Sequence, residues 1–535
     1  MLYFDCHAKI GQRPLKHKRT RWSTEHLLAD MDLAEISGAL VSHAVAHSYD
    51  PRYGNARLAG ELAKAPERLF GLWCLLPLAS PDFYVAGDDL LRAMAAADIR
   101  AVRCVAGNYS LHQEMMGPTL AALEEAEILL LLEAGWATDD FFAFFHDLLT
   151  RHPHLPVLLT DHTWSQQRYV HRLMQLHENL HLEFSSYQIN RGIEYYAAEF
   201  GAERLLFGTG GTEKSPGAAR TYIDYAQISA AAKRQIAGEN LRRLLKGQGP
   251  AVAAAPARSE DPWVVDVRAG TPQRGLIIDA HAHVLHEGGQ GAGINYIMFD
   301  GDAEGMLEVN AWCGIDRIAM MSWHGPVCTD AVDGNDIVWR AMQAYGERII
   351  GVAVIDPTHM DRGEIDVEIQ RRYVEQGFVG LKPYVRMNLS YEDPDFDPWW
   401  AFGNAHRLYA LMHVAGHTGG VAGVGRLADR YPEMSWLIAH SGGSYAFAEE
   451  VAACIADHPN VYAEITLTPV TNRVVEFLVA ATDDEHVLFG SDAPMRDPRQ
   501  QLGWVLWADL SPQSKAKILG GNFQRILDRA IAPEG

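Results

Sequence analysis

Two histidines separated by one small residue end a short apolar run at residues 276–283, LIIDAHAH. Alternate side chains of a strand point to the same side, so His281 and His283 would direct two imidazoles toward one point at the strand's end. Such a pair can hold a metal ion. Two solvated histidines in a turn are the alternative. Because the pair follows Asp279 and precedes the glycine-rich loop Gly288 to Gly293, we predict a metal site.

Length, composition and charge limit the classes of function. The 535 residues predict two or more domains, and 48% hydrophobic with 21% charged residues is ordinary for a globular protein. The net charge of −22 disfavours nucleic acid and anionic membrane surfaces, so we expect a small-molecule or peptide substrate. The six cysteines form no CxxC pair, which predicts reduced, mostly buried thiols, and we expect neither a leader segment nor a membrane-spanning run. We expect a cytoplasmic protein.

The sequence contains an internal repeat. Four short motifs recur in the same order at a nearly constant separation of about 280 residues, which indicates one duplicated domain. The matched pairs are DCHAK (5–9) with DAHAH (279–283), Asn55 and APERLFG (65–71) with Asn335 and YGERIIG (345–351), RLLFGTG (204–210) with HVLFGSD (486–492), and IAGENL (236–241) with ILGGNF (518–523).

A stretch rich in Gly, Ala and Pro begins at Gly247 and has no periodic pattern. We therefore expect domains at residues 1–247 and 276–535, joined by a linker at 248–275. An extended arm packed on one half through Trp263 is the alternative. The duplication also predicts that the halves pack as a pseudo-dimer, and a homo-oligomer of the whole chain is left open.

Short apolar runs alternate with stretches of helical length in each half. This alternation predicts a parallel sheet, and about 250 residues per half suit a closed (β/α)8 barrel. In the second half the expected strands are 317–321, 349–354, 379–382, 410–414, 435–440 and 487–490, and the expected helices include 397–408 and 424–431. Chemistry in such barrels collects at the C-terminal ends of the strands, where Lys382, His413, His440 and Asp492 would lie.

Imidazoles and a carboxylate from different strands would form a site for a divalent first-row metal, with one position left for water. The second half resembles the amidohydrolase superfamily, in its amidohydrolase-2 branch of metal-dependent TIM-barrel enzymes. The resemblance covers nearly all of residues 276–527, through the motifs DAHAH (279–283), FDPWW (396–400) leading into His413, AHSGG (439–443), GSDAP (490–494) and GNFQRIL (521–527).

The resemblance implies that His281, His283 and His413 bind one divalent metal, zinc or manganese, with Asp492 as a further ligand or as the base beside it. His440 would orient or polarise the substrate. A bound metal lowers the pKa of its water toward about 7 and supplies hydroxide at neutral pH. His417 is the rival to His413.

Lys382 has two readings from the resemblance: a carbamylated lysine that bridges two metals, or a cation that binds an anionic group of the substrate. A solvated lysine at a strand end is the third reading. Arg103 takes its place in the first half. The pair Trp399 and Trp400 is expected in the core, with an aromatic substrate wall as the alternative.

The first half has lost part of the ligand set. Lys9 stands where the second half has His283, Glu133 where it has His413, His162 where it has His440, and Gly210 where it has Asp492. Because an ammonium repels a metal cation and the lost Asp removes a ligand, residues 1–247 are expected to form a degenerate, catalytically silent barrel.

These observations favour a metal-dependent hydrolase that cleaves a C–N or C–O bond of a small carbonyl compound. A non-oxidative decarboxylase is the alternative, since the same ligand set serves both and the amidohydrolase-2 branch contains both. A binding or scaffolding protein with two silent barrels is the third hypothesis. The intact ligand set of the second half argues against it.

Overall fold

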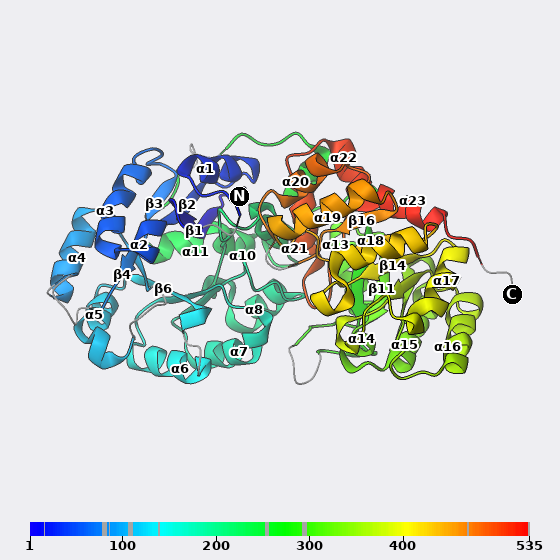
Figure 1. Cartoon of the computed structure of the whole chain (residues 1–535). Helices are drawn as coiled ribbons and strands as arrows, with labels where there is room; N and C mark the ends of the chain where they lie inside the picture. Colours follow the sequence, from blue (N-terminus) through cyan, green and yellow to red (C-terminus); the bar gives the residue numbers. More distant parts are fainter. Residues whose placement is uncertain are drawn as a thin grey trace. The chain divides into compact units, whose positions relative to one another are not determined.

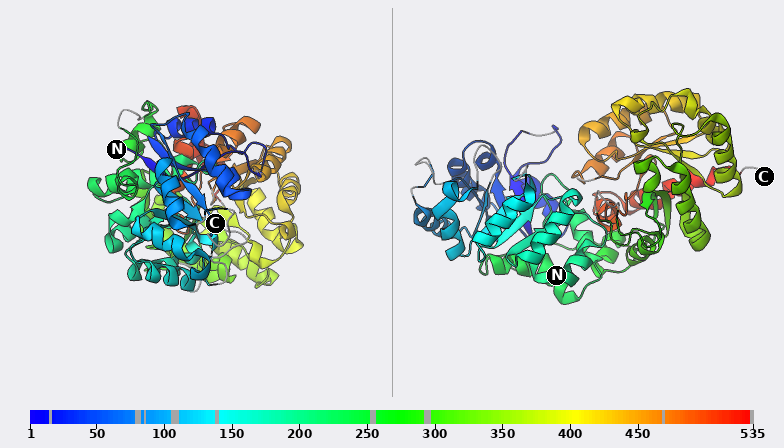
Figure 2. Two further views of the ribbon diagram at one scale, coloured as in Figure 1. Left: turned by 90° about the vertical axis from the view of Figure 1, so that its left-hand side faces the viewer. Right: turned by 90° about the horizontal axis from the view of Figure 1, so that it is seen from below.

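The computed structural model describes residues 1–14, 17–77, 83–84, 86–104, 111–136, 140–251, 256–291, 297–467 and 470–532. The chain divides into two compact units (Figure 1). Unit 1 consists of Met1–Gln188 and Gly192–Glu260, and unit 2 of Ile189–Arg191 and Asp261–Gly535. In each unit the helices lie outside the strands (Figure 2).

Unit 2 is a parallel (β/α)8 barrel, as predicted. Its eight strands follow one another in chain order around the sheet. The end of the last strand returns to the first through a parallel bridge between Ala282 and Ala493, and the amide of His283 donates to the Ala493 carbonyl at 2.6 Å. The strands are β10 (Ile278–Val284), β11 (Arg317–Ser322), β12 (Ile349–Val354), β13 (Gly380–Lys382), β14 (Tyr409–Met412), β15 (Ser435–Ile438), β16 (Val461–Glu464) and β17 (Val487–Leu488).

Helices surround this sheet, and the two expected at 397–408 and 424–431 are present as α17 and α18. The helices of unit 2 are α12 (Pro262–Ala269), α13 (Ala303–Cys313), α14 (His324–Cys328), α15 (Ala331–Tyr345), α16 (Arg362–Ile369), α17 (Asp397–Ala405), α18 (Gly420–Arg430), α19 (Tyr445–Asp457), α20 (Val474–Ala481), α21 (Pro498–Leu506), α22 (Pro512–Ala516) and α23 (Asn522–Asp528).

Unit 1 repeats the same order of parallel strands. Its third strand is interrupted at Leu72, whose amide still donates to the Val41 carbonyl at 2.9 Å. A parallel bridge between Ala8 and Gly211 joins the end of the unit to its start. The strands are β1 (Phe4–Ile10), β2 (Gly38–His43), β3 (Leu69–Gly71), β4 (Trp73–Leu75), β5 (Ala101–Cys104), β6 (Leu129–Glu133), β7 (Val157–Thr160), β8 (Leu180–Glu183) and β9 (Leu205–Leu206).

The helices of unit 1 connect these strands. They are α1 (Thr24–Leu33), α2 (Ala44–Ser48), α3 (Pro51–Leu62), α4 (Gly87–Ala96), α5 (Gln113–Glu125), α6 (Phe141–Arg151), α7 (Gln167–Leu176), α8 (Gly192–Phe200), α9 (Pro216–Asp224), α10 (Ala230–Arg234) and α11 (Asn240–Leu244).

Alternate residues of the strands fill the core of each unit. In unit 2, Ile278 and Ala280 of β10 pack with Leu411, Leu437 and Leu488 from strands farther along the chain. The equivalent cluster of unit 1 contains Phe4, Leu40, Leu131, Leu158 and Leu206. A β-bulge between Asp279 and Ala282 interrupts the regular alternation of β10 just where His281 lies.

The repeated asparagines are structural. Asn335 on α15 donates to the Val354 carbonyl at 2.9 Å and accepts from the Val354 amide at 2.8 Å. Asn55 on α3 makes the same pair of bonds with Cys74, at 2.8 and 2.9 Å. Both asparagines are buried, so each satisfies backbone groups at the end of the third strand that would otherwise be unpaired.

The IAGEN and ILGGN motifs each form a π-helical turn, at Gln235–Glu239 and Lys517–Gly521. The asparagine after each turn holds the start of the last strand. Asn522 Nδ2 donates to the carbonyls of Asp484 and Val487, and Asn240 Nδ2 to those of Ala202 and Leu205. This repeated motif therefore supplies the hydrogen bonds that hold the last strand of each barrel.

Helix α12 falls within the stretch expected to be a linker. Trp263, Val264 and Val267 are buried on one face of it, and Trp263 Nε1 donates to the Pro512 carbonyl at 3.0 Å. The short amphipathic spacing of these three apolar residues explains why a helix forms there. The glycine-rich loop Gly288 to Gly293 is described only up to Gly291, and its last two residues lie outside the described residues.

All six cysteines are free thiols, four of them buried, Cys454 partly buried and Cys328 exposed. This agrees with the expectation of reduced cysteines. Among the described residues, no helix is long and apolar enough to cross a membrane.

Candidate metal centre

Three predicted ligands meet at the C-terminal end of the unit 2 barrel. His281 and His283 lie on β10, and Asp492 follows β17. Asp492 Oδ1 lies 3.2 Å from His283 Nε2 and 3.6 Å from His281 Nε2, and one donor atom from each residue fits within a 4.8 Å cluster. All three side chains are buried. Two imidazoles and a carboxylate at these distances suit a divalent metal.

Hydrogen bonds from the outer ring nitrogens orient both imidazoles. His281 Nδ1 lies 2.9 Å from Glu464 Oε2, and His283 Nδ1 lies 3.4 Å from the Ser322 carbonyl. Each Nδ1–H therefore donates away from the cluster, which leaves each Nε2 lone pair facing Asp492. Burial lowers the pKa of His283 to about 3 and that of His281 well below 6.5, so both rings are neutral, as metal ligation requires.

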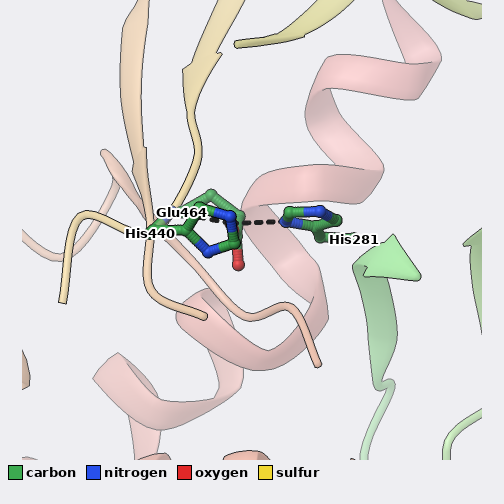
Figure 3. Close-up of side chains that lie close together, drawn as sticks. All are labelled: His281, His440 and Glu464. Carbon is green, nitrogen blue, oxygen red and sulfur yellow. Dashed lines mark hydrogen bonds and ion pairs between the residues drawn. The ribbon is translucent and has the colours of Figure 1, made fainter. Parts of the chain in front are cut away.

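Glu464, which ends β16 and is fully buried, was not predicted from the sequence. Figure 3 shows its carboxylate beside the rings of His281 and His440. Glu464 Oε1 accepts from the amide of Thr466 at 2.8 Å and from its hydroxyl, while burial raises the Glu464 pKa to about 7. The repeat carried the signal for this residue, because Glu183 ends β8 of unit 1 and accepts from Ser185 in the same way.

His440 and His413 lie next to one another. His440 Nδ1 is 2.9 Å from the Thr466 carbonyl, and His440 Nε2 is 3.3 Å from His413 Nδ1. His440 also falls within a second possible donor cluster, with His281 and Glu464. His413 belongs to neither cluster found among the described residues. The structure therefore brings His281, His283 and Asp492 together, with His413 next to His440.

Lys382 ends β13 and is completely buried. No described residue accepts a hydrogen bond from its ammonium. Burial lowers the Lys382 pKa to about 7, and its positive charge also lowers the pKa of His281, His283 and His413. The lysine thus lies close to the histidine cluster rather than in solvent, which removes the solvated reading.

Arg496, also missed from the sequence, pairs with Asp492. Its guanidinium donates to Asp492 Oδ2, whereas Oδ1 of the same carboxylate faces the two histidines. Both side chains are buried. Arg496 thus stabilises the ionised carboxylate and fixes its orientation.

Two site residues have left-handed backbone conformations, with φ of 64° at His440 and 57° at Asp492. Such angles cost about 1 kcal/mol or more in residues other than glycine and often occur at active sites. Gly490 allows a close approach nearby, because a Cβ there would lie 2.3 Å from Glu464 Oε1 and 2.8 Å from His281 Cβ. The GSD motif therefore permits this packing of β17 against the site.

The remaining predicted positions lie away from the cluster. His417 is exposed and its Nε2 bonds to the Val385 carbonyl at 2.9 Å. Trp399 and Trp400 are buried in the core, where Trp400 stacks against Phe396. Trp323, which was not predicted, packs its ring edge-on against His283 at 5.0 Å.

Strand register corrects one position of the first half. Leu159 on β7 pairs with Leu182 just as Ile438 on β15 pairs with Ala463. The residue after β7 that answers His440 is therefore Asp161, which shares its left-handed φ at 55°, and His162 is one position later. Both donor clusters found among the described residues lie in unit 2.

The sequence profile of a family described as Amidohydrolase matches residues 5–247 and, again, 278–529. The chain belongs to this family, and both of its barrels do. No curated protein matches the chain.

Three solved structures that resemble the chain each match slightly less than half of it. A dihydroxybenzoic acid decarboxylase from a Polaromonas species, solved with manganese and 2-nitroresorcinol, has 16% identity and a TM-score of 0.39 over 48% of this chain and 97% of its own. A 4-oxalomesaconate hydratase from Rhodopseudomonas palustris has 17% identity and a TM-score of 0.37 over 48% of this chain and 96% of its own. A putative amidohydrolase from Staphylococcus aureus has 13% identity and a TM-score of 0.38 over 46% of this chain and 100% of its own.

Proposed function

We propose that the second barrel is a metal-dependent non-oxidative decarboxylase of a small carboxylate. The observation that supports it best is Lys382. A buried ammonium without an acceptor is costly, and a substrate carboxylate would supply both the acceptor and the opposite charge.

The proposed metal ligands are His281, His283 and Asp492, with His413 as a further donor from β14. The donor set fits a divalent ion because the imidazoles are neutral, buried and oriented by Glu464 and the Ser322 carbonyl. Nitrogen and oxygen ligands suit zinc and manganese alike. When bound, the ion would polarise a carboxylate or carbonyl oxygen of the substrate.

Lys382 Nζ would donate a hydrogen bond to the substrate carboxylate. When the bond between the carboxylate and its neighbouring carbon breaks, the electron pair stays on that carbon and CO2 leaves. A proton from Lys382 Nζ would then take the place of CO2. A pKa of about 7 suits this transfer, because the group can hold and release a proton near neutrality.

The pairing of Asp492 favours decarboxylation over hydrolysis. A hydrolase needs a base that removes a proton from the attacking water. The Arg496 guanidinium stabilises the Asp492 carboxylate and so makes it a poorer proton acceptor, although a better anionic ligand.

A hydrolase remains the second candidate because of His440. Its Nδ1–H donates to the Thr466 carbonyl, so its Nε2 carries a lone pair, which lies 3.3 Å from His413 Nδ1. Burial lowers the His440 pKa well below 6.5. A neutral His440 at the site could accept a proton from water in place of Asp492.

The test is product analysis with the zinc- or manganese-loaded chain. The substrates are paired, each aromatic or keto carboxylic acid with its amide. We expect labelled CO2 from carboxyl-labelled acids, no ammonia from the amides, and loss of CO2 release in Lys382→Met. Ammonia release from the amides without CO2 from the acids would favour the hydrolase.

The double variant His281→Ala/His283→Ala is the control for metal dependence, and Lys515→Met is the control for loss of a buried lysine. Lys515 is buried in unit 2 but bonds to Asp261 at 2.6 Å and to the Leu506 carbonyl at 2.7 Å. CO2 release that survives the double variant would contradict a metal-dependent reaction.

A further inference from the structure

Unit 1 carries charged side chains at the strand ends where unit 2 has its ligand cluster. The amide of Gly210 donates to the His7 carbonyl, as that of Asp492 does to His281, which places Lys9 of β1 at the position of His283. Thus an ammonium stands where unit 2 has a metal ligand. The side chains of Glu133 and Asp161 at these strand ends are 27% and 35% exposed, so solvent reaches them.

Almost every other cation of this cluster has a carboxylate partner. Arg103 Nη2 lies 2.5 Å from Glu133 Oε1, and Lys214 Nζ lies 2.7 Å from Asp161 Oδ1. Arg13 Nε lies 3.0 Å from Glu213 Oε1. These pairs neutralise one another and leave Lys9 as the cation to be explained.

Lys9 is partly buried, and its Nζ has no hydrogen-bond acceptor among the described residues. Ser42, the strand partner of Lys9, accepts from Arg103 Nη1 at 3.5 Å, so the guanidinium lies near the ammonium. Arg103 Nε is also buried without an acceptor. Burial and the charge of Arg103 lower the Lys9 pKa. The carboxylates of Glu133, Glu213 and Asp161 oppose this shift, although none of them forms an ion pair with the ammonium.

We propose that the strand ends of the first barrel bind a small organic carboxylate, held by Lys9 Nζ next to Arg103. One ammonium without an ion-pair partner matches one negative charge. A phosphate dianion would leave excess negative charge beside Glu133 and Asp161, so a monoanion is favoured. The first barrel then has a ligand of its own, bound by fixed cations in place of a metal.

The test uses the full chain with His281→Ala/His283→Ala, so that the second barrel lacks its imidazole ligands. Benzoate is the probe, titrated by calorimetry at constant ionic strength. We expect saturable binding, weakened about tenfold or more by Lys9→Met and by Lys9→Gln, because a charge-assisted hydrogen bond is lost. Lys9→Arg should retain most of the affinity.

Two matched variants locate the bound anion. Lys64→Met removes an exposed lysine of unit 1, and Lys382→Met removes the buried lysine of unit 2. Lys64→Met should not change the benzoate affinity, whereas Lys382→Met removes any separate binding of benzoate at the second barrel and should leave the binding that depends on Lys9. The proposal is overturned if benzoate does not bind saturably, if Lys9→Met and Lys9→Gln bind as the parent does, or if Lys382→Met abolishes binding.

This outcome is independent of the proposed decarboxylase, since the second barrel lacks the proposed ligands His281 and His283 in every arm. Thermal unfolding with and without benzoate gives a second readout, because a ligand of the folded state raises Tm. We expect benzoate to raise the Tm of the parent and of Lys9→Arg but not of Lys9→Met. An equal rise in all three would also overturn the proposal.

Discussion

The buried ammonium of Lys382 is expected to lower the stability of the folded protein. Its pKa of about 7 in the folded chain lies below the 10.5 of an exposed lysine, so the unfolded chain binds the proton more tightly. The penalty is complete below pH 7 and disappears as pH rises toward 10.5. Stability should therefore increase with pH over this window.

Lys382→Met should stabilise the metal-free protein, by on the order of 2–4 kcal/mol at pH 6 and by less at pH 9. Thermal or urea unfolding in the presence of a chelator at the two pH values measures this. Lys515→Met is the matched control, and it should destabilise the protein because it leaves Asp261 without its partner. A stabilisation that is equal at both pH values would refute the buried-charge explanation.

We expect Glu464 to act through His281, whose Nδ1 lies 2.9 Å from its carboxylate. Losing the acceptor of the Nδ1–H frees the ring to rotate or change tautomer, so Glu464→Ala should weaken metal binding about 10- to 100-fold. Glu464→Gln should have a smaller effect, because its amide oxygen can still accept. Competition with a chelating dye measures both, and Glu183→Ala in unit 1 should leave the affinity unchanged.

At the scale of elements, most strands of the second barrel could be predicted because their apolar runs are continuous. The run at 349–354 coincides with β12, and those at 379–382 and 435–440 include β13 and β15. The strand Val461–Glu464 was missed, since it is only four residues long and alternates apolar with polar or small residues. Because this strand was missed, Glu464 at its end was also missed, although Glu183 holds the equivalent position in the first half.

The convergence of side chains was less predictable than the strands. That Asp492 meets His281 and His283 depends on closure of the barrel between β17 and β10, which no local pattern encodes. Arg496 was missed because it lies in a loop, four residues after Asp492. The sequence comparison matched His162 with His440, whereas the strand register places Asp161 at that position.

The close approach at the end of β17 gives an element-scale prediction. Gly490→Ala would place a Cβ in contact with Glu464 and His281, so the strand end must shift. We expect a loss of about 1–3 kcal/mol in stability together with greatly weakened metal binding. Gly208→Ala is the matched change in unit 1, where the Cβ would lie 2.6 Å from Glu183 Oε2, and it should lower stability while leaving metal content intact.

For the whole molecule, duplication has given two barrels with the same scaffold and different strand ends. The hydrogen bonds of Asn55 and Asn335, and of Asn240 and Asn522, are kept in both units. The proposed metal ligands are not kept, because Lys9 and Gly210 of the first barrel stand in place of His283 and Asp492. The asparagines hold the scaffold of both barrels, whereas the proposed ligand set occurs in the second barrel.

We therefore expect about one metal ion per chain, bound by the second barrel. Elemental analysis after reconstitution with zinc or manganese should show it in the wild type and lose it in His281→Ala/His283→Ala. His7→Ala, which removes the equivalent of His281 from the first barrel, should leave it unchanged, because Lys9 and Gly210 provide no ligand there. Two ions per chain, or one that His7→Ala removes, would mean that the first barrel binds metal despite its ammonium.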